Sequence, residues 1–378
     1  MKRENLNFYV IVLLLAALIF SFLTIYAFGD HHTGTSHISA SSAALYIPEN
    51  EVFVFLKDAE TRMPMASTTK IMTALVALSK SEMSESVEID DNAIGIEGSS
   101  AYLKKGDVLT MEELLYALLL GSANDAAVAI ACHISGGVYE FASLMNETAA
   151  EMGLENTHFT NPHGLDNEDH YTTARDLAII TSHALQNSEF RKIVSTYKKS
   201  FVSEERCRTY VNHNKLLNMY DGCVGVKTGF TKKSGRCLVS AAERDGLTFI
   251  AVTLDAPNDW EDHKKMFDYA FETFEKIIFS NEMEQVYKIP VIDGKKTYLA
   301  VTNTEKASLI TDRGDYSIEK NIKLVKYAVA PINKGDILGE ILYTLNGEEV
   351  ARLPLIATET VEKAESKNFF EKIISLFK

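Results

Sequence analysis

Residues 66–78 read Ala-Ser-Thr-Thr-Lys-Ile-Met-Thr-Ala-Leu-Val-Ala-Leu, with a serine and a lysine three positions apart where an apolar helical stretch begins. Residues three apart lie on one face of a helix, so the Lys70 amine is expected beside the Ser67 hydroxyl. A serine becomes a nucleophile when a base takes its proton, and a lysine whose pKa is lowered by burial or a second cation is such a base. The stretch therefore predicts acyl transfer through Ser67.

The S-x-x-K pattern alone is weak evidence, because it occurs at Ser67, Ser195, Ser317 and Ser375. The last three stand in strand-like, charged or tail contexts, and composition accounts for them. Only Ser67 is followed by an apolar helix. The assignment of the nucleophile therefore depends on partner motifs elsewhere in the chain.

A second polar motif, Ser122-Ala123-Asn124, follows Gly121 at a break between two apolar helical stretches. Ser122 could pass a proton between the lysine and a leaving group, and the Asn124 amide could hold both a substrate carbonyl and the lysine. Serine and asparagine are also common helix N-caps, so a purely structural role remains open for this motif.

A third motif, Lys227-Thr228-Gly229, ends a predicted strand and is followed by Phe230. A cation and a hydroxyl at a strand end can bind a carboxylate, and a glycine lets a substrate backbone approach closely. An ordinary turn would use the same residues. The three motifs together are stronger evidence than any one alone, because their occurrence in this order is typical of penicillin-binding proteins and class A β-lactamases.

On these motifs the chain resembles the serine-type D-alanyl-D-alanine carboxypeptidases, the low-molecular-mass penicillin-binding proteins. The likeness extends to the segments 98–103, 106–107, 112–116, 161–166, 170–175 and 212–217. It covers about residues 40–280, and the β-rich part and tail that follow are similar to the family's C-terminal domain and membrane anchor.

The resemblance implies a role for each motif residue. These are the catalytic residues Ser67 (acyl-ester nucleophile), Lys70 (general base) and Ser122 (proton relay); the substrate-binding residues Asn124, Lys227, Thr228 and Gly229; and the backbone N–H groups of Ser67 and Phe230 as the oxyanion hole. Where some members carry an arginine, this chain has His213. We therefore expect carboxylate recognition to differ in detail and acylation to be unchanged.

The implied substrate is the D-Ala-D-Ala terminus of a peptidoglycan stem peptide, with β-lactams as covalent inhibitors and no cofactor or metal. A β-lactamase on the same scaffold is one alternative, although no glutamate that would activate water can be assigned. An inactive wall-binding scaffold protein is another. No H-E-x-x-H or comparable ligand spacing supports a metallopeptidase. The formal net charge of −14 argues against nucleic acid as a partner.

The two ends of the chain predict an extracytoplasmic protein at the outer face of the cell membrane. Residues 1–29 place two cations before an apolar run, which is the pattern of either a cleaved signal peptide or a retained anchor. Residues 30–42 are expected to be a flexible tether. Residues 358–378 read as an acidic spacer and a short amphipathic helix, which would lie in the membrane interface or pack on its own domain.

Between the ends, the sequence predicts an α+β domain over residues 43–281 and an all-β domain over 286–357. The first runs strands, helices, strands and a long amphipathic helix over 260–279, which suggests an antiparallel sheet covered by helices. The resemblance implies a penicillin-binding or serine β-lactamase-like domain with a helical subdomain. The second has short alternating runs and turn signals that favour a small sandwich or barrel.

Four cysteines, Cys132, Cys207, Cys223 and Cys237, lack any C-x-x-C spacing. In an exported chain they would form up to two disulfides. The other interpretation is that they are small buried apolar residues, since free cysteine is among the most buried residue types.

Overall fold

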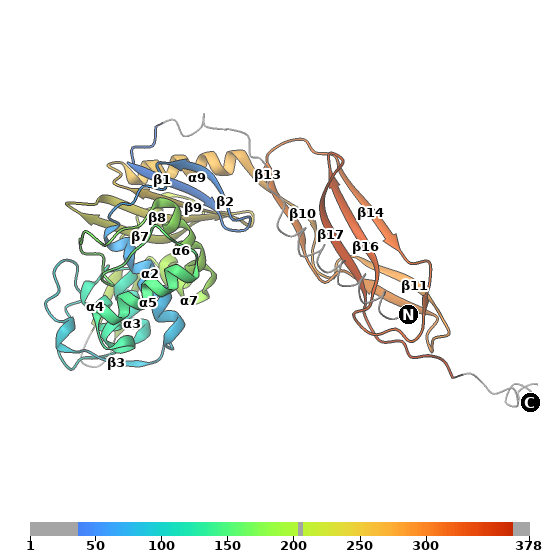
Figure 1. Cartoon of the computed structure of the whole chain (residues 1–378), viewed down its shortest axis with the longest axis horizontal. Helices are drawn as coiled ribbons and strands as arrows, with labels where there is room; N and C mark the ends of the chain where they lie inside the picture. The colour runs from blue at the N-terminus through green and yellow to red at the C-terminus, as the bar shows by residue number, and fades with distance from the viewer. Residues whose placement is uncertain (1–36, 203–206, 366–378) are drawn as a thin grey trace, which may run out of the picture. The chain divides into compact units, whose positions relative to one another are not determined.

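The computed structural model describes residues 37–202 and 207–365 (Figure 1). A five-stranded antiparallel sheet organises the first part, in the order β2-β1-β9-β8-β7. Its strands are β1 (Ser42–Ile47), β2 (Val52–Lys57), β7 (Cys223–Thr231), β8 (Gly235–Arg244) and β9 (Leu247–Leu254). The first strand pairs with β9, so the two ends of this domain meet in the sheet centre.

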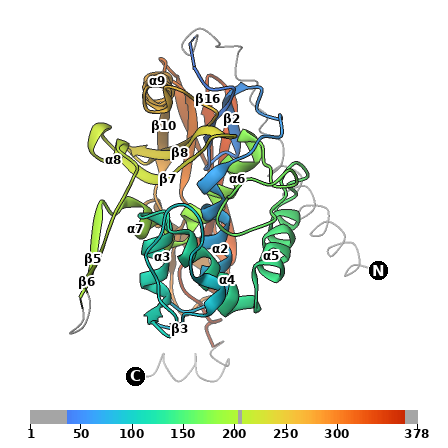
Figure 2. The same cartoon turned by 90° about the vertical axis from the view of Figure 1, so that its left-hand side faces the viewer.

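Helices cover both faces of the sheet. α9 (Asp259–Thr273) lies on one face, and α6 and α7 lie on the other with the remaining helices beyond them (Figures 1 and 2). Those helices are α2 (Lys70–Lys80), α3 (Met111–Leu119), α4 (Asn124–Ser135), α5 (Val138–Glu151), α6 (Ala174–Gln186) and α7 (Ser188–Ser195). The other five helices pack on α2, whose residues from Lys70 to Ala74 are all buried. The expected antiparallel sheet with a helical subdomain is confirmed.

Short elements complete the domain. There are two two-stranded ladders: β3 (Ser86–Glu88) pairs with β4 (Val108–Thr110), and β5 (Lys198–Val202) pairs with β6 (Cys207–Val211). Two short 3-10 turns are η1 (Ala66–Thr69) and η2 (Asp91–Ala93). The short helix α8 (Leu216–Met219) precedes β7. The β5–β6 hairpin, seen at the side of Figure 2, and α7 were not predicted. Thr110 caps α3, since its hydroxyl accepts from the Glu113 N–H at 3.1 Å.

The helix predicted over 260–279 is wrong in its second half. α9 ends at Thr273, and Phe274–Ser280 forms β10, which pairs with β13. The aromatic spacing matched a helical stripe, but in the strand the Ile278 side chain is 49% exposed where the helix would have buried it. The β-branched isoleucines of this segment and its pairing with β13 favour the extended form.

The C-terminal region is all-β, as predicted. Its strands are β11 (Val286–Ile292), β12 (Tyr298–Thr302), β13 (Ala307–Asp312), β14 (Ile318–Leu324), β15 (Ala328–Val329), β16 (Ile337–Leu345) and β17 (Glu348–Ala357). Six form one sheet in the order β14-β16-β17-β12-β11-β15 around a separate apolar core. The turn at Asn346-Gly347 has both φ angles positive, as a tight hairpin with a right-handed twist requires.

The expected tether does not extend through residue 42. The Asp262 carboxylate on α9 accepts hydrogen bonds from the Ser39 N–H and hydroxyl and from the Ala40 N–H, and Ser42 begins β1. Residues 39–42 therefore belong to the folded domain. The predicted signal or anchor segment, most of the tether and the C-terminal amphipathic helix lie outside the described residues.

Within residues 37–202 and 207–365, no single helix is long and apolar enough to cross a membrane, and α4 and α5 meet that test only together, as a pair bent by 83°. The four cysteines are free. Cys237 is buried and Cys132 and Cys223 are half-buried, as small apolar residues would be, whereas Cys207 is exposed.

Candidate active site

The Ser67 motif occupies the 3-10 turn η1 and the start of α2. Lys70 is the first residue of α2, and its Nζ lies 2.9 Å from the Ser67 Oγ. The lysine side chain is fully buried. The three-residue spacing thus places the Lys70 amine beside the Ser67 hydroxyl, as predicted.

Three oxygens surround the Lys70 amine. Besides Ser67, the Asn124 Oδ1 lies 2.7 Å from Nζ and the backbone oxygen of His163 lies 2.6 Å from it. A neutral amine has two hydrogens and one lone pair. If those hydrogens are donated to Asn124 and His163, the lone pair faces Ser67, whose hydroxyl can donate to it. This arrangement is what a general base requires.

The electrostatic environment favours the neutral form of the lysine. Burial lowers the pKa of Lys70 well below its usual range, the charge of Lys227 lowers it further, and the Asp125 carboxylate opposes them. Lys227 is itself buried, and burial lowers its pKa to about 7. Burial and the Lys227 charge thus both favour the neutral amine, which is the form that can accept a proton.

Asn124 is held by backbone oxygens of residues 97 and 99. Its backbone N–H donates to the Ser99 oxygen at 2.7 Å, and its Nδ2 donates to the Glu97 oxygen at 2.6 Å. Gly98 has φ +93°, and a Cβ there would stand 2.8 Å from the Asn124 Nδ2. The amide oxygen is therefore aimed at Lys70.

The neighbouring Asp125 ties the same segment to α4. Its buried carboxylate accepts from the Ser100 hydroxyl at 2.6 Å and from the N–H groups of Ala101 and Leu103 at 2.9 and 3.1 Å. The 98–103 segment, for which the sequence predicted no role of its own, therefore supports Asn124.

Ser122 lies in the turn between α3 and α4, two residues before Asn124. Its φ is +57°, a left-handed conformation that non-glycine residues rarely adopt, and its side chain is nearly buried. Strained conformations of this kind persist where the surroundings demand them. Ser122 is not among the described hydrogen-bond partners of Lys70, so its relay role stays a prediction.

The Lys227 motif lies on β7, which stands at one end of the sheet order and packs against η1. A Cβ on Gly229 would stand 3.0 Å from the Ser67 backbone nitrogen and 3.1 Å from the Met65 oxygen. With any larger residue at this position, β7 or the Ser67 turn would have to move by a few tenths of an ångström. The Phe230 side chain is 67% exposed, so a role of this residue would fall to its backbone.

The His163 carbonyl, which accepts a hydrogen bond from Lys70, was not predicted from the sequence. It lies in the 160–166 loop, which Asn161 shapes by accepting from the His163 and Gly164 N–H groups at 3.2 and 2.7 Å. Thr73 on α2 donates to the Pro162 oxygen at 2.6 Å. The resemblance pointed to this segment, but a backbone group leaves no side-chain signal.

His213 is presented between two buried asparagines. Asn212 donates to the Val194 oxygen at 2.9 Å, and Asn214 accepts from the Leu216 N–H at 3.0 Å. Burial and the charge of Lys227 lower the pKa of His213, so its ring lies within electrostatic reach of the third motif.

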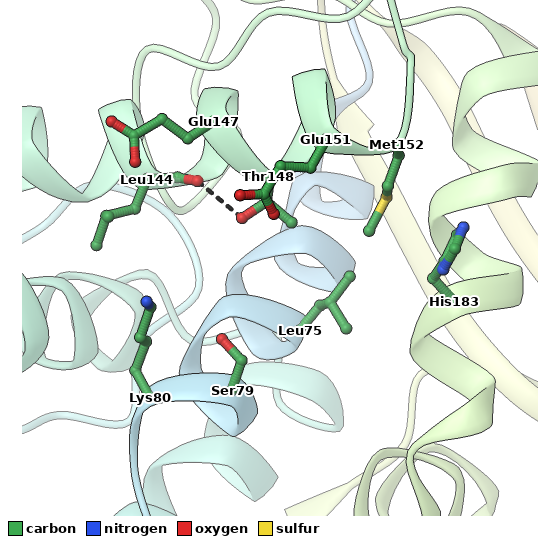
Figure 3. A pocket seen from close by; sticks show the side chains of 9 residues that line it. All are labelled: Leu75, Ser79, Lys80, Leu144, Glu147, Thr148, Glu151, Met152 and His183. Atoms are coloured by element: carbon green, nitrogen blue, oxygen red, sulfur yellow. Dashed lines mark hydrogen bonds between the residues drawn. The ribbon is translucent and has the colours of Figure 1, made fainter.

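A pocket of about 380 Å³ lies apart from the motif residues, between α2, α5 and α6 (Figure 3). It opens at the C-terminal half of α2, whereas Lys70 is at the other end of that helix. Its lining residues are Leu75, Ser79, Lys80, Leu144, Glu147, Thr148, Glu151, Met152 and His183. None of them belongs to the three motifs.

Comparisons with known proteins agree with this geometry. Residues 30–258 match the D-alanyl-D-alanine carboxypeptidase family, and residues 274–363 match the C-terminal domain of penicillin-binding protein 5. The carboxypeptidase DacF of Bacillus subtilis is 34% identical over 345 residues, covering 88% of each chain.

Solved structures show the same fold. Penicillin-binding protein 5 from Haemophilus influenzae aligns with a TM-score of 0.65 and 29% identity, over 86% of this chain and 98% of that one. The Streptomyces K15 DD-transpeptidase aligns at 0.59 and 36% identity, over 62% of this chain and 98% of that one. The resemblance inferred from the motifs is confirmed: the chain belongs to the D-alanyl-D-alanine carboxypeptidase family.

Proposed function

We propose that this protein removes the terminal D-alanine from peptidoglycan stem pentapeptides through an acyl-enzyme on Ser67. The observation that carries the proposal is the buried Lys70 amine, which lies 2.9 Å from the Ser67 Oγ and has two other acceptors, Asn124 and His163, for its own hydrogens. Membership of the carboxypeptidase family supports the choice of substrate.

In the acylation step, the Ser67 oxygen attacks the carbonyl carbon of the penultimate D-alanine while Lys70 takes the hydroxyl proton. The backbone N–H groups of Ser67 and Phe230 stabilise the oxyanion. The peptide C–N bond then breaks, and the proton passes through Lys70 and Ser122 to the departing amine. D-Alanine leaves, and the shortened peptide remains as an ester on Ser67.

Deacylation uses the same groups in turn. Lys70 takes a proton from a water molecule, the hydroxide oxygen attacks the ester carbonyl, and the proton returns to the Ser67 oxygen as the ester bond breaks. In a β-lactam the amine that leaves remains tethered to the acyl group, so it blocks this water. We therefore expect β-lactams to be long-lived covalent inhibitors.

Substrate recognition falls to the third motif. Lys227 and Thr228 supply a cation and a hydroxyl for the terminal carboxylate of the substrate, with Asn124 orienting the peptide. β7 stands at the end of the sheet order, so its outer edge can pair with an extended peptide backbone. Gly229 keeps that edge close to Ser67.

A β-lactamase is not favoured. Rapid deacylation usually needs a carboxylate that activates water, and among the described residues no carboxylate hydrogen-bonds to Ser67 or Lys70. The nearby Asp125 is occupied by the 98–103 segment. An inactive scaffold protein is equally disfavoured, because all three motifs keep their residues and η1, α2 and β7 remain in contact.

We further propose that the enzyme acts outside the cytoplasm, at the outer face of the membrane. The cationic and apolar N-terminus and the amphipathic segment near residue 378 support this location. Membrane fractionation of the producing cells, followed by the intact mass of the recovered protein, would distinguish a retained anchor from a signal peptide cleaved near Gly29. Recovery from the cytoplasmic fraction would contradict the proposal.

The activity is tested by D-alanine release from a synthetic stem pentapeptide. The wild type should release D-alanine, and Ser67→Ala should release none above the uncatalysed rate. Ser195→Ala, which alters another S-x-x-K serine that is exposed on α7, is the matched control and should retain full activity. Release by Ser67→Ala at a comparable rate would refute the proposal.

A further inference from the structure

His170 is a buried residue that no step of the proposed reaction uses, and it joins two segments of the active site. Its Nδ1 accepts from the Thr160 N–H at 3.0 Å, with the Thr160 hydroxyl at 3.3 Å. Its Nε2 lies 2.8 Å from the Thr69 Oγ1. A ring nitrogen that accepts from a backbone N–H carries no proton, so the hydrogen of the neutral ring is on Nε2 and is donated to Thr69.

The Thr69 hydroxyl links His170 to the peptide bond that precedes Ser67. Since Thr69 accepts from His170, its own hydrogen is free to be donated to the Ala66 oxygen, 2.8 Å away. The Ala66 carbonyl and the Ser67 N–H belong to one planar trans peptide, so they point in opposite directions. Fixing the Ala66 oxygen therefore also fixes the direction of the Ser67 N–H.

This peptide needs such support. Ala66 has φ +47°, a left-handed conformation that non-glycine residues adopt only where the surrounding structure holds them in it. Gly164 packs on it so closely that a Cβ there would stand 1.9 Å from the Ala66 oxygen. The same 160–166 loop supplies the His163 carbonyl to Lys70.

We propose that His170 is a positioning residue for acylation: through Thr69 it aims the Ser67 N–H into the oxyanion hole, and through Thr160 it holds the loop that orients Lys70. The inference rests on the proposed acylation of Ser67. Burial, with smaller contributions from His158 and Lys70, lowers the pKa of His170 to about 4, so its ring stays neutral at working pH.

The test separates the two ends of the ring. Thr69→Val removes the hydroxyl with little change of shape, whereas Thr69→Ser keeps it. His170→Gln retains a donor toward Thr69, and His170→Asn retains only the acceptor toward Thr160. For each variant, stopped-flow measurement with a fluorescent penicillin gives the affinity (Kd) and the acylation rate constant separately, and thermal unfolding reports the fold.

We expect Thr69→Val and His170→Asn to acylate at least tenfold more slowly with Kd within twofold, because a misaimed oxyanion donor affects the transition state and not the ground state. The acylation rate constant of Thr69→Ser should stay within threefold of the wild-type value. That of His170→Gln should be higher than that of His170→Asn. The Thr69→Val and His170→Asn losses should not add in the double variant.

An acylation rate constant within twofold of the wild type in Thr69→Val, or a loss confined to Kd, would overturn the inference. This result is distinct from failure of the proposed function, in which the wild type itself would not acylate. If His170→Asn does not fold, the Thr69→Val and Thr69→Ser pair decides alone.

Discussion

The Nζ of Lys70 lies 2.9 Å from the Oγ of Ser67, and the same amine is held by oxygens of Asn124 and His163 at 2.7 and 2.6 Å. The base is therefore positioned from three separate parts of the chain. Burial and the charge of Lys227 both lower the pKa of this amine and so favour its neutral form.

Replacing Lys70 with methionine should slow acylation by penicillin by about 10²–10⁴-fold, the usual contribution of a general base. The methionine fills most of the volume but takes no proton. Lys80→Met is the matched control, since Lys80 is an exposed lysine at the other end of α2. Stopped-flow acylation measures both, and a Lys70→Met enzyme that reacts as fast as the control would exclude Lys70 as the base.

The pH dependence of acylation should reveal the influence of Lys227 on Lys70. Acylation requires a neutral Lys70, so its rate constant falls as the pH drops through the pKa of that amine. The Lys227 charge lowers this pKa, so Lys227→Met should raise it and shift the acid limb to higher pH. Acylation rate constants at saturating penicillin over pH 5 to 9 test this. If the fall in rate occurs at the same pH in Lys227→Met as in the wild type, or at a lower pH, the prediction is contradicted.

Stability should respond to pH through the buried Lys227. Its folded pKa is about 7, whereas the ordinary value is 10.5. The unfolded chain therefore binds more protons between these values, and the wild type should gain stability relative to Lys227→Met as the pH rises from about 7 to about 10. Below pH 7 the difference should be constant.

Urea unfolding midpoints of the two proteins at several pH values measure this difference. The paired comparison cancels the titration of all other groups to first order. A difference that is flat from pH 7 to 10 would mean that Lys227 keeps an ordinary pKa in the folded protein.

Gly229→Ala should impair acylation more than folding. The added Cβ would stand 3.0 Å from the Ser67 nitrogen and 3.1 Å from the Ala66 Cβ, so β7 or the nucleophile turn must move by a few tenths of an ångström. Misplacement at this site should cost at least tenfold in acylation rate. Lys232→Ala, an exposed change in the next turn, should have no effect. Equal rates for the two variants would contradict this prediction.

Much of the site could be predicted because its signals are local. The Ser67 and Lys70 pair follows from helical spacing alone, and context excluded Ser195, which lies on the surface of α7. Asn124 and Lys227 needed the family resemblance, because nothing local shows that Asn124 contacts Lys70 or that the charge of Lys227 acts on it.

What could not be predicted depends on tertiary contacts. The His163 carbonyl is a backbone group, and the link from His170 to Ala66 passes through ordinary threonines. The strand at Phe274–Ser280 was mistaken for helix because the aromatic spacing fitted both, and pairing with β13 decides it. The extent of the tether was overestimated because its end is bound by Asp262, more than two hundred residues away.

Acylation of Ser67 is best tested by peptide-mapped mass spectrometry after penicillin treatment. We expect one adduct per chain, on the peptide that contains Ser67, and no adduct in Ser67→Ala. An adduct on another serine, such as Ser195, or an undiminished adduct in Ser67→Ala, would contradict it.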